Sequence, residues 1–166
     1  MNVTRLGTLT EDEELVIAEI IGCGIAVHRA LGPGYGERIY KRAMCLELKA
    51  RDIAFEVERV VEVVYRDEVL GTHRIDLIVQ SLVVLELKAV ERLDAVYKRQ
   101  VVAYLKASGL RAGLLMNFNA ALLKDGLQRV IVSSSSRSPH SNSGQPRPNM
   151  LDPTFPSRRV PTALLV

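Results

Sequence analysis

Residues 74–88 read RIDLIVQSLVVLELK, and this stretch decides the fold of the chain. Two apolar runs flank Gln80-Ser81, a pattern that predicts a β-hairpin with a two-residue turn. Side chains alternate between the faces of a strand, so Glu86 and Lys88 point the same way. The hairpin is expected to bring Asp76 beside them within an apolar sheet. Carboxylates there are costly unless a metal ion or a cation neutralises them, which makes the hairpin a candidate functional site.

The composition around this hairpin is that of an ordinary globular protein. The 166 residues suit one domain with a sizeable core, and 48% of them are hydrophobic and 25% charged. No apolar run approaches the ~20 residues of a membrane span, and residues 1–10 lack the pattern of a signal peptide. Cys23 and Cys45 lack ligand-like spacing and are expected to be buried free thiols. Together these features predict a cytoplasmic protein with no membrane partner.

The net charge of +3 belongs to the end of the chain. The segment from Ser133 onward holds four arginines and one aspartate, which accounts for the whole excess. The rest of the chain is neutral, so the sequence pI of about 9.0 is weak evidence for nucleic-acid binding.

Local patterns predict the order of helices and strands. Thr10 and Glu13 form a capping box for a helix that ends near Ala30. Asp94 and Gly109 are the expected cap and end of a later helix. The full prediction is helices at 11–30, 37–51 and between 94 and 109, with strands at 55–65, 69–79, 82–88, 112–116 and 127–132. The order ααβββαβ(β) predicts an α/β (α+β) domain with a mixed sheet of four to five strands flanked by helices.

Helical spacing also suggests which residues face the core. For the first helix these are Leu15, Ala18, Gly22, Ile25 and Ala26. For the second helix they are Ile39, Ala43, Leu46 and Ala50 on one face, with Tyr40, Met44 and Leu48 beside them.

Three segments are expected along the chain. Residues 1–10 are a short N-terminal arm, and residues 11–132 are the folded domain. Residues 133–166 are rich in Ser, Pro and Arg, a composition that predicts disorder.

The acids of the hairpin have two interpretations. Asp76 and Glu86 could form surface ion pairs, which are common on strands. Both lie in runs too apolar for a solvated face, which favours a divalent metal site for Mg²⁺ or Mn²⁺. Lys88 would then orient a water molecule or stabilise charge on a phosphate.

The neighbouring helices supply further candidates. Glu37 could compensate the helix dipole or act as another metal or water ligand. Gln100 and Tyr104 are four residues apart on one helix face, where they could simply be hydrogen-bonded or could support the acids. His73 and Arg74 are kept outside the site.

Several separated motifs resemble those of the GxxExxY proteins. Residues 34–40 (GYGERIY) match the Gly-x-x-Glu-x-x-Tyr signature, and residues 27–34, 86–91 and 117–119 also resemble that family. The resemblance covers about residues 11–132. The family is placed in the PD-(D/E)xK nuclease-like superfamily, which implies a restriction-endonuclease-like core. Position by position, Asp76 matches the metal-binding Asp of that superfamily and Glu86 matches its second acid. Lys88 matches the motif lysine, and Glu37 matches the helical acid. Gln100 and Tyr104 match the Gln-x-x-x-Tyr element of RecB-like nucleases.

The leading hypothesis is therefore a Mg²⁺-dependent nuclease that hydrolyses phosphodiester bonds of nucleic acid, with DNA favoured over RNA. Asp76, Glu86 and Glu37 bind the metal, and Lys88 acts on water or phosphate. The alternative is a catalytically silent nucleic-acid-binding or scaffold module, whose basic patch would comprise Lys41-Arg42, Arg92 and Lys98-Arg99. A homodimer that completes its groove across a two-fold axis is a third hypothesis.

Overall fold

A computed structural model describes residues 8–133 of the chain. The expected order of elements is confirmed, and their ends differ from the predictions by a residue or two. A short 3-10 helix before the last strand was not predicted. The elements are α1 (Glu11–Leu31), α2 (Glu37–Ala50), β1 (Phe55–Tyr65), β2 (Glu68–Val79), β3 (Val83–Lys88), α3 (Ala95–Ser108), β4 (Ala112–Asn117), η1 (Leu123–Gly126) and β5 (Leu127–Ile131).

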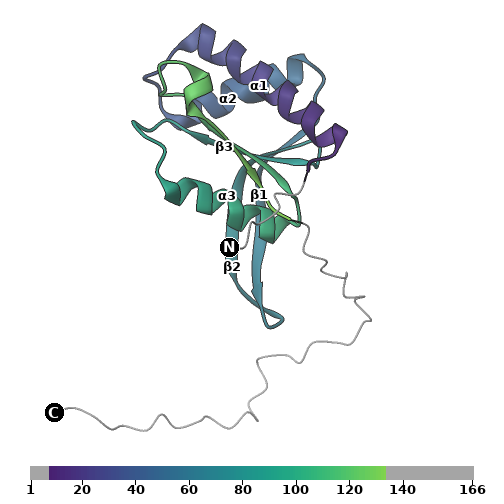
Figure 1. Ribbon diagram of the computed structural model, residues 1–166. Coiled ribbons are helices and arrows are strands. Elements are labelled where there is room, and N and C mark those ends of the chain that lie inside the picture. The colour runs from purple at the N-terminus through teal and green to yellow at the C-terminus, as the bar shows by residue number, and fades with distance from the viewer. Residues whose placement is uncertain (1–7, 134–166) are drawn as a thin grey trace, which may run out of the picture. The chain divides into compact units, whose positions relative to one another are not determined.

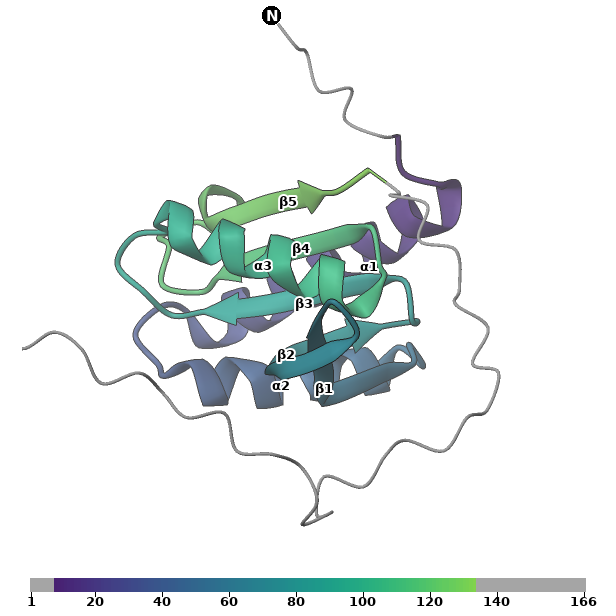
Figure 2. The ribbon, with the colours of Figure 1, turned by 90° about the horizontal axis from the view of Figure 1, so that it is seen from below.

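The five strands form one mixed sheet in the order β1-β2-β3-β4-β5. Only β3 and β4 pair in parallel, and α3 is the crossover between them. Helices α1 and α2 pack on one face of the sheet and α3 packs on the other (Figures 1 and 2). The predicted mixed α/β (α+β) sheet is confirmed, and its order is consistent with a restriction-endonuclease-like fold.

The N-terminal cap of α1 confirms the predicted capping box. The Glu13 backbone N–H donates to Thr10 Oγ1 at 3.2 Å, and the Thr10 N–H donates to Glu13 Oε2 at 2.8 Å. Two of the unpaired backbone donors at the start of the helix are thus satisfied. At the end of α3, Gly109 takes the left-handed conformation expected of a terminating glycine (φ 75°).

The predicted core faces of the first two helices are partly wrong. Leu15 and Leu46 are each 64% exposed, and Ile39 is 46% exposed. The buried residues lie on the adjacent stripe instead, because helical spacing is equally compatible with neighbouring stripes and only packing against the sheet selects one. The buried side chains are Val16, Ile17, Ile20, Cys23 and Val27 of α1 and Tyr40, Met44 and Leu48 of α2.

The predicted two-residue turn of the central hairpin is also wrong. Val79 pairs with Val83, so the connection has three residues, Gln80 to Leu82. Gln80 and Ser81 take left-handed conformations (φ 51° and 56°), and the Leu82 N–H closes the loop on the Val79 carbonyl at 3.0 Å. Continuing the observed register places Asp76 across from Glu86, where a two-residue turn would have placed it across from Leu85.

The far half of the β1–β2 hairpin extends beyond the helices (Figure 1). Val60, Val64, Tyr65, Val69 and Leu70 are 43% to 66% exposed. Nothing in residues 8–133 covers these apolar side chains, which lie on both faces of the hairpin because successive strand residues point to opposite faces.

Some predictions concern residues outside the described part. The N-terminal arm is described only from Thr8, and the expected disordered tail is described only at Ser133. Within residues 8–133, no helix has both the length and the apolar character needed to span a membrane. Both cysteines are free thiols, but Cys45 is only half-buried.

Candidate active site

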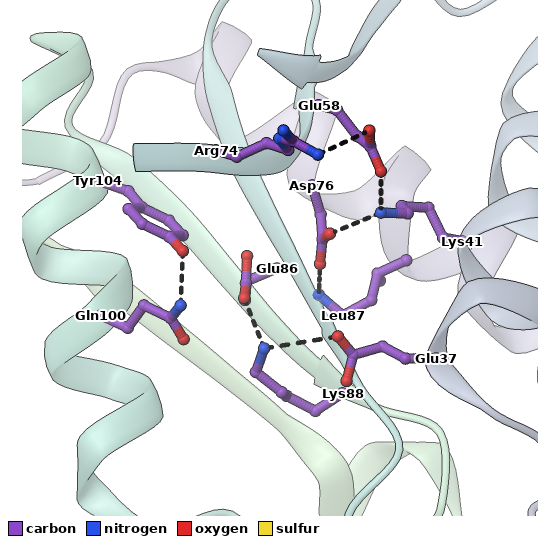
Figure 3. A network of polar contacts seen from close by, with 10 residues as sticks. All are labelled: Glu37, Lys41, Glu58, Arg74, Asp76, Glu86, Leu87, Lys88, Gln100 and Tyr104. Atoms are coloured by element: carbon purple, nitrogen blue, oxygen red, sulfur yellow. Dashed lines mark hydrogen bonds and ion pairs between the residues drawn. The ribbon is translucent and has the colours of Figure 1, made fainter. Parts of the chain in front are cut away.

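The candidate site begins where β2 and β3 stop pairing. Their observed pairing ends at Leu77 and Leu85. Beyond that point the Leu87 backbone N–H donates to Asp76 Oδ2 at 3.1 Å, so a side chain replaces the backbone acceptor. Figure 3 shows Asp76 and Glu86 between Gln100 and Tyr104 on one side and Glu37 and Lys41 on the other. Because Leu87 lies between Glu86 and Lys88, this bond fixes Asp76 relative to both.

Lys88 links two acids from different elements. Its ammonium lies 2.6 Å from Glu86 Oε1 and 3.7 Å from Glu37 Oε1. The Glu86 side chain is 4% exposed and that of Lys88 is 10% exposed, whereas Glu37 at the start of α2 is 44% exposed. A charged pair this deeply buried is costly to desolvate and contributes little net stability, which favours a functional role.

Burial and neighbouring charge perturb both groups of this pair. Desolvation and the charge of Asp76 raise the pKa of Glu86 to about 7, despite the hydrogen bond from Lys88. Burial lowers the pKa of Lys88, but the Glu86 hydrogen bond and the surrounding carboxylates outweigh it and leave that pKa above its ordinary value. Lys88 is therefore a permanent cation near neutral pH, whereas Glu86 exists in both protonation states.

The sequence did not identify Lys41 and Glu58 as parts of the site. Lys41 Nζ donates to Asp76 Oδ1 at 3.1 Å and to Glu58 Oε1 at 2.8 Å. Glu58 also pairs with Arg74 at 3.6 Å. Lys41 follows Glu37 by four residues on α2, a spacing that could have indicated it. Glu58 has a left-handed backbone conformation within β1 (φ 52°), which no pattern in the sequence predicted.

The Gly-x-x-Glu-x-x-Tyr stretch has a physical explanation in the turn before α2. Gly34 takes φ 111°, a conformation that side chains disfavour. The buried Tyr40 hydroxyl donates to the Gly32 carbonyl at 2.7 Å and accepts from the Tyr35 N–H at 3.1 Å. Its ring stacks on Phe118 with centroids 4.5 Å apart. The motif thereby anchors the first turn of α2, which carries Glu37 toward Lys88.

The predicted pair on α3 is brought together near the acids. Gln100 Nε2 donates to Tyr104 Oη at 2.5 Å, and Tyr104 is 4% exposed. Burial and the charge of Glu86 raise the Tyr104 pKa, so its phenol keeps its proton for another acceptor. His73, kept outside the site by the sequence analysis, contacts the Tyr104 ring edge-on at 5.2 Å.

The sequence also did not identify Tyr97 and Asn117 as residues of the site. The Lys88 ammonium lies 5.4 Å from the centre of the Tyr97 ring, in cation–π contact. Asn117, next to Lys88 on β4, binds both backbone groups of Val90 at 3.0 and 2.8 Å. These contacts hold the segment that follows the motif lysine.

Two residues of the expected basic patch are engaged by acids. Lys41 is engaged by Asp76 and Glu58, and Arg92 pairs with Asp94 at 3.6 Å. Arg42 lies on α2 and Lys98-Arg99 on α3, helices that cover opposite faces of the sheet.

The donor set suits a divalent ion held by two carboxylates. Glu86 Oε2 is buried and has no hydrogen-bond partner within residues 8–133, and Asp76 is close enough for its charge to act on Glu86. No three His, Cys, Asp or Glu side chains in this part of the chain converge to hold a metal ion, and Lys88 lies between Glu86 and Glu37. Two carboxylates are enough for Mg²⁺, which usually keeps several waters.

The chain is similar to a known protein family. A family model described as the PD-(D/E)XK nuclease superfamily matches residues 14–130. No match was found among curated proteins or among solved structures.

Proposed function

Because the chain belongs to the PD-(D/E)XK nuclease superfamily, we propose that it is a Mg²⁺-dependent nuclease acting on DNA. The observation that carries this proposal is the buried Glu86–Lys88 pair beside Asp76. The Glu86 oxygen that has no partner within residues 8–133 can accept a metal ion, and the Lys88 cation can stabilise charge on a phosphate; both contributions can promote phosphodiester hydrolysis.

Each residue has a distinct task in the proposed reaction. Asp76 and Glu86 hold the ion, and Mn²⁺ should replace Mg²⁺ at such oxygen ligands. The bound ion would polarise the phosphodiester and lower the pKa of a water. Lys88, as an ammonium, donates hydrogen bonds and stabilises negative charge on the phosphoryl oxygens. Glu37 keeps that ammonium in place from the side opposite Glu86, and a direct metal contact by Glu37 would require Lys88 to move.

Gln100 and Tyr104 support this arrangement from α3. Gln100 occupies the acceptor side of the Tyr104 hydroxyl, so the hydroxyl proton points elsewhere. The influence of Glu86 on the Tyr104 pKa is consistent with a phenol directed at the acids. We assign both residues a positioning role.

Membership of the GxxExxY proteins, a cytoplasmic location and a homodimeric state complete the proposal. The first is supported by the roles of Gly34, Glu37 and Tyr40 around the start of α2. The second is supported by two free thiols. The third is supported by the uncovered apolar surface of the β1–β2 hairpin.

The decisive experiment is cleavage of single-stranded, duplex and branched DNA with Mg²⁺ or Mn²⁺. Asp76→Ala and Lys88→Ala should each reduce the rate by at least about 100-fold, a typical loss when one charge-stabilising group is removed. Glu62→Ala and Lys49→Ala are matched controls, because both residues are exposed and take no part in the site. Cleavage that survives both site substitutions would refute the assignment.

A second candidate function is a catalytically silent nucleic-acid-binding module. It is favoured by the engagement of Asp76 by Lys41 and of Glu86 by Lys88, and by the finding that no three His, Cys, Asp or Glu side chains of residues 8–133 converge to hold a metal ion. Calorimetric titration with Mn²⁺ separates the two candidates. Heat of binding that disappears in Asp76→Ala supports the nuclease, and no binding to the folded protein supports the silent module.

A further inference from the structure

A cleft of about 630 Å³ lies between the end of β3 and the start of α3. It is lined by Val90, Glu91, Arg92, Asp94 and Tyr97. Its volume falls within the roughly 300–1,000 Å³ typical of small-molecule sites. None of these residues holds the proposed metal, so the cleft is a separate feature with its own chemistry.

The cleft adjoins the candidate active site through a shared contact. Tyr97 lines it and also lies 5.4 Å from Lys88 Nζ, measured from the ring centre. A substrate whose phosphate reaches Lys88 would therefore place a neighbouring group against Tyr97.

One wall of the cleft, at Val90, is held in place by Asn117 of the sheet. The Asn117 side chain accepts from the Val90 N–H at 3.0 Å and donates to the Val90 carbonyl at 2.8 Å. Asn117 also pairs with Lys88 in the β3–β4 register. Val90 in the wall of the cleft and Lys88 are thus both anchored to Asn117. Because this wall is already fixed, binding a ligand costs less conformational entropy.

The charges around the cleft argue against phosphate as its occupant. Glu91 and Asp94 supply two carboxylates against the single guanidinium of Arg92. The Arg92–Asp94 pair is exposed (86% and 60%), so it contributes little energy and can rearrange around a ligand. Carboxylates accept hydrogen bonds from exocyclic amino groups, and an aromatic ring stacks on a planar base.

We propose that this cleft is a base-binding subsite, in which Tyr97 stacks on an unpaired nucleobase next to the phosphate held at Lys88. The proposal rests on the proposed nucleic-acid substrate but not on its cleavage. Stacking needs a base whose face is free, so the subsite selects single-stranded DNA or a frayed end over an intact duplex.

The test uses the absence of tryptophan from the chain. Tyr97→Trp introduces a single fluorescent reporter in the cleft, and Tyr65→Trp introduces one on the β1–β2 hairpin, where Tyr65 is 58% exposed. Each full-length variant is titrated without divalent metal with short single-stranded DNA, the same strand with abasic sites, and duplex DNA. Anisotropy of a labelled strand reports binding independently.

We expect single-stranded DNA to quench the Tyr97→Trp reporter but not the Tyr65→Trp reporter. The abasic strand and the duplex should leave both unquenched. In a second series, Tyr97→Leu should weaken binding of single-stranded DNA about tenfold and Tyr97→Phe should retain it, because stacking needs only the ring.

Other outcomes overturn the proposed subsite, and they show whether the proposed function fails with it. Binding by anisotropy without quenching refutes the base subsite and leaves the proposed function intact. Equal quenching by the abasic strand means that the backbone, and not a base, occupies the cleft. Absence of DNA binding refutes the subsite, and absence of cleavage with Mg²⁺ or Mn²⁺ as well refutes both proposals. Quenching without cleavage supports the subsite and favours the silent module.

Discussion

Glu86 combines deep burial with a proposed role as a metal ligand, which requires the charged carboxylate. Its side chain is 4% exposed, one oxygen is bound by Lys88 and the other has no partner within residues 8–133. Desolvation and Asp76 raise its pKa to about 7. In the proposed site, a proton and the metal ion would therefore compete for this carboxylate near neutral pH.

This competition predicts a pH-dependent metal affinity. The raised pKa means that most Glu86 carboxyl groups are protonated at pH 6 and most are ionised at pH 8. Mn²⁺ should consequently bind about tenfold more weakly at pH 6 than at pH 8, as a group with a pKa near 7 requires. Calorimetric titration at the two pH values measures this. Glu86→Gln should bind weakly at both, and equal wild-type affinities would contradict the prediction.

The start of α2 shows how an element positions the site. The turn before it depends on Gly34, and Tyr40 then ties the helix to Gly32 and Tyr35. Glu37 and Lys41 follow on one side of the helix and reach Lys88 and Asp76. A substitution that strains this turn should therefore lower the free energy of unfolding before it affects the chemistry of the site.

Gly34→Ala tests the backbone requirement alone. No atom lies within 4 Å of the added Cβ, so the cost comes from the φ of 111°. We expect the free energy of unfolding to fall by about 1–2 kcal/mol, as for side chains forced into left-handed backbone. Gly71→Ala is the matched control, since its Cβ also meets nothing within 4 Å and its backbone is not left-handed. Urea unfolding of both variants provides the measurement, and equal stability would refute the argument.

At the scale of the whole domain, the site lies where the two helical layers meet the diverging strands. Lys41 comes from the α1–α2 layer and Tyr104 from the α3 layer. The β1–β2 hairpin continues past this junction with exposed apolar residues. Such exposed apolar side chains are typical of a protein–protein interface, and they support the proposed homodimer.

Leu70→Gln tests this assignment. Light scattering of the wild type should give twice the 18.4 kDa mass of the chain, and Leu70→Gln should shift it toward the monomer because the substitution adds polar groups to the apolar surface. Leu46→Gln is the control, since Leu46 is equally exposed on α2 (64% against 66%) and lies outside the hairpin. A monomeric wild type would exclude the dimer.

Local signals in the sequence were enough to predict the order of the elements and most of their ends. The capping box at Thr10, the terminating Gly109 and the alternation in residues 55–65 each act over a few residues, so they can be read without the fold. The acids and the lysine of residues 74–88 were also identified from their apolar surroundings. That they form the active site remains a proposal.

Contacts between distant segments could not be predicted in the same way. The length of the central loop decides that Asp76 lies across from Glu86, and packing against the sheet decides that Leu15 and Leu46 face outward. Lys41 meets Asp76 from 35 residues away, and Tyr97 reaches Lys88 across the β3–α3 connection. Such pairings depend on how complete layers pack, because burial energy is shared over many side chains and carries no local signature.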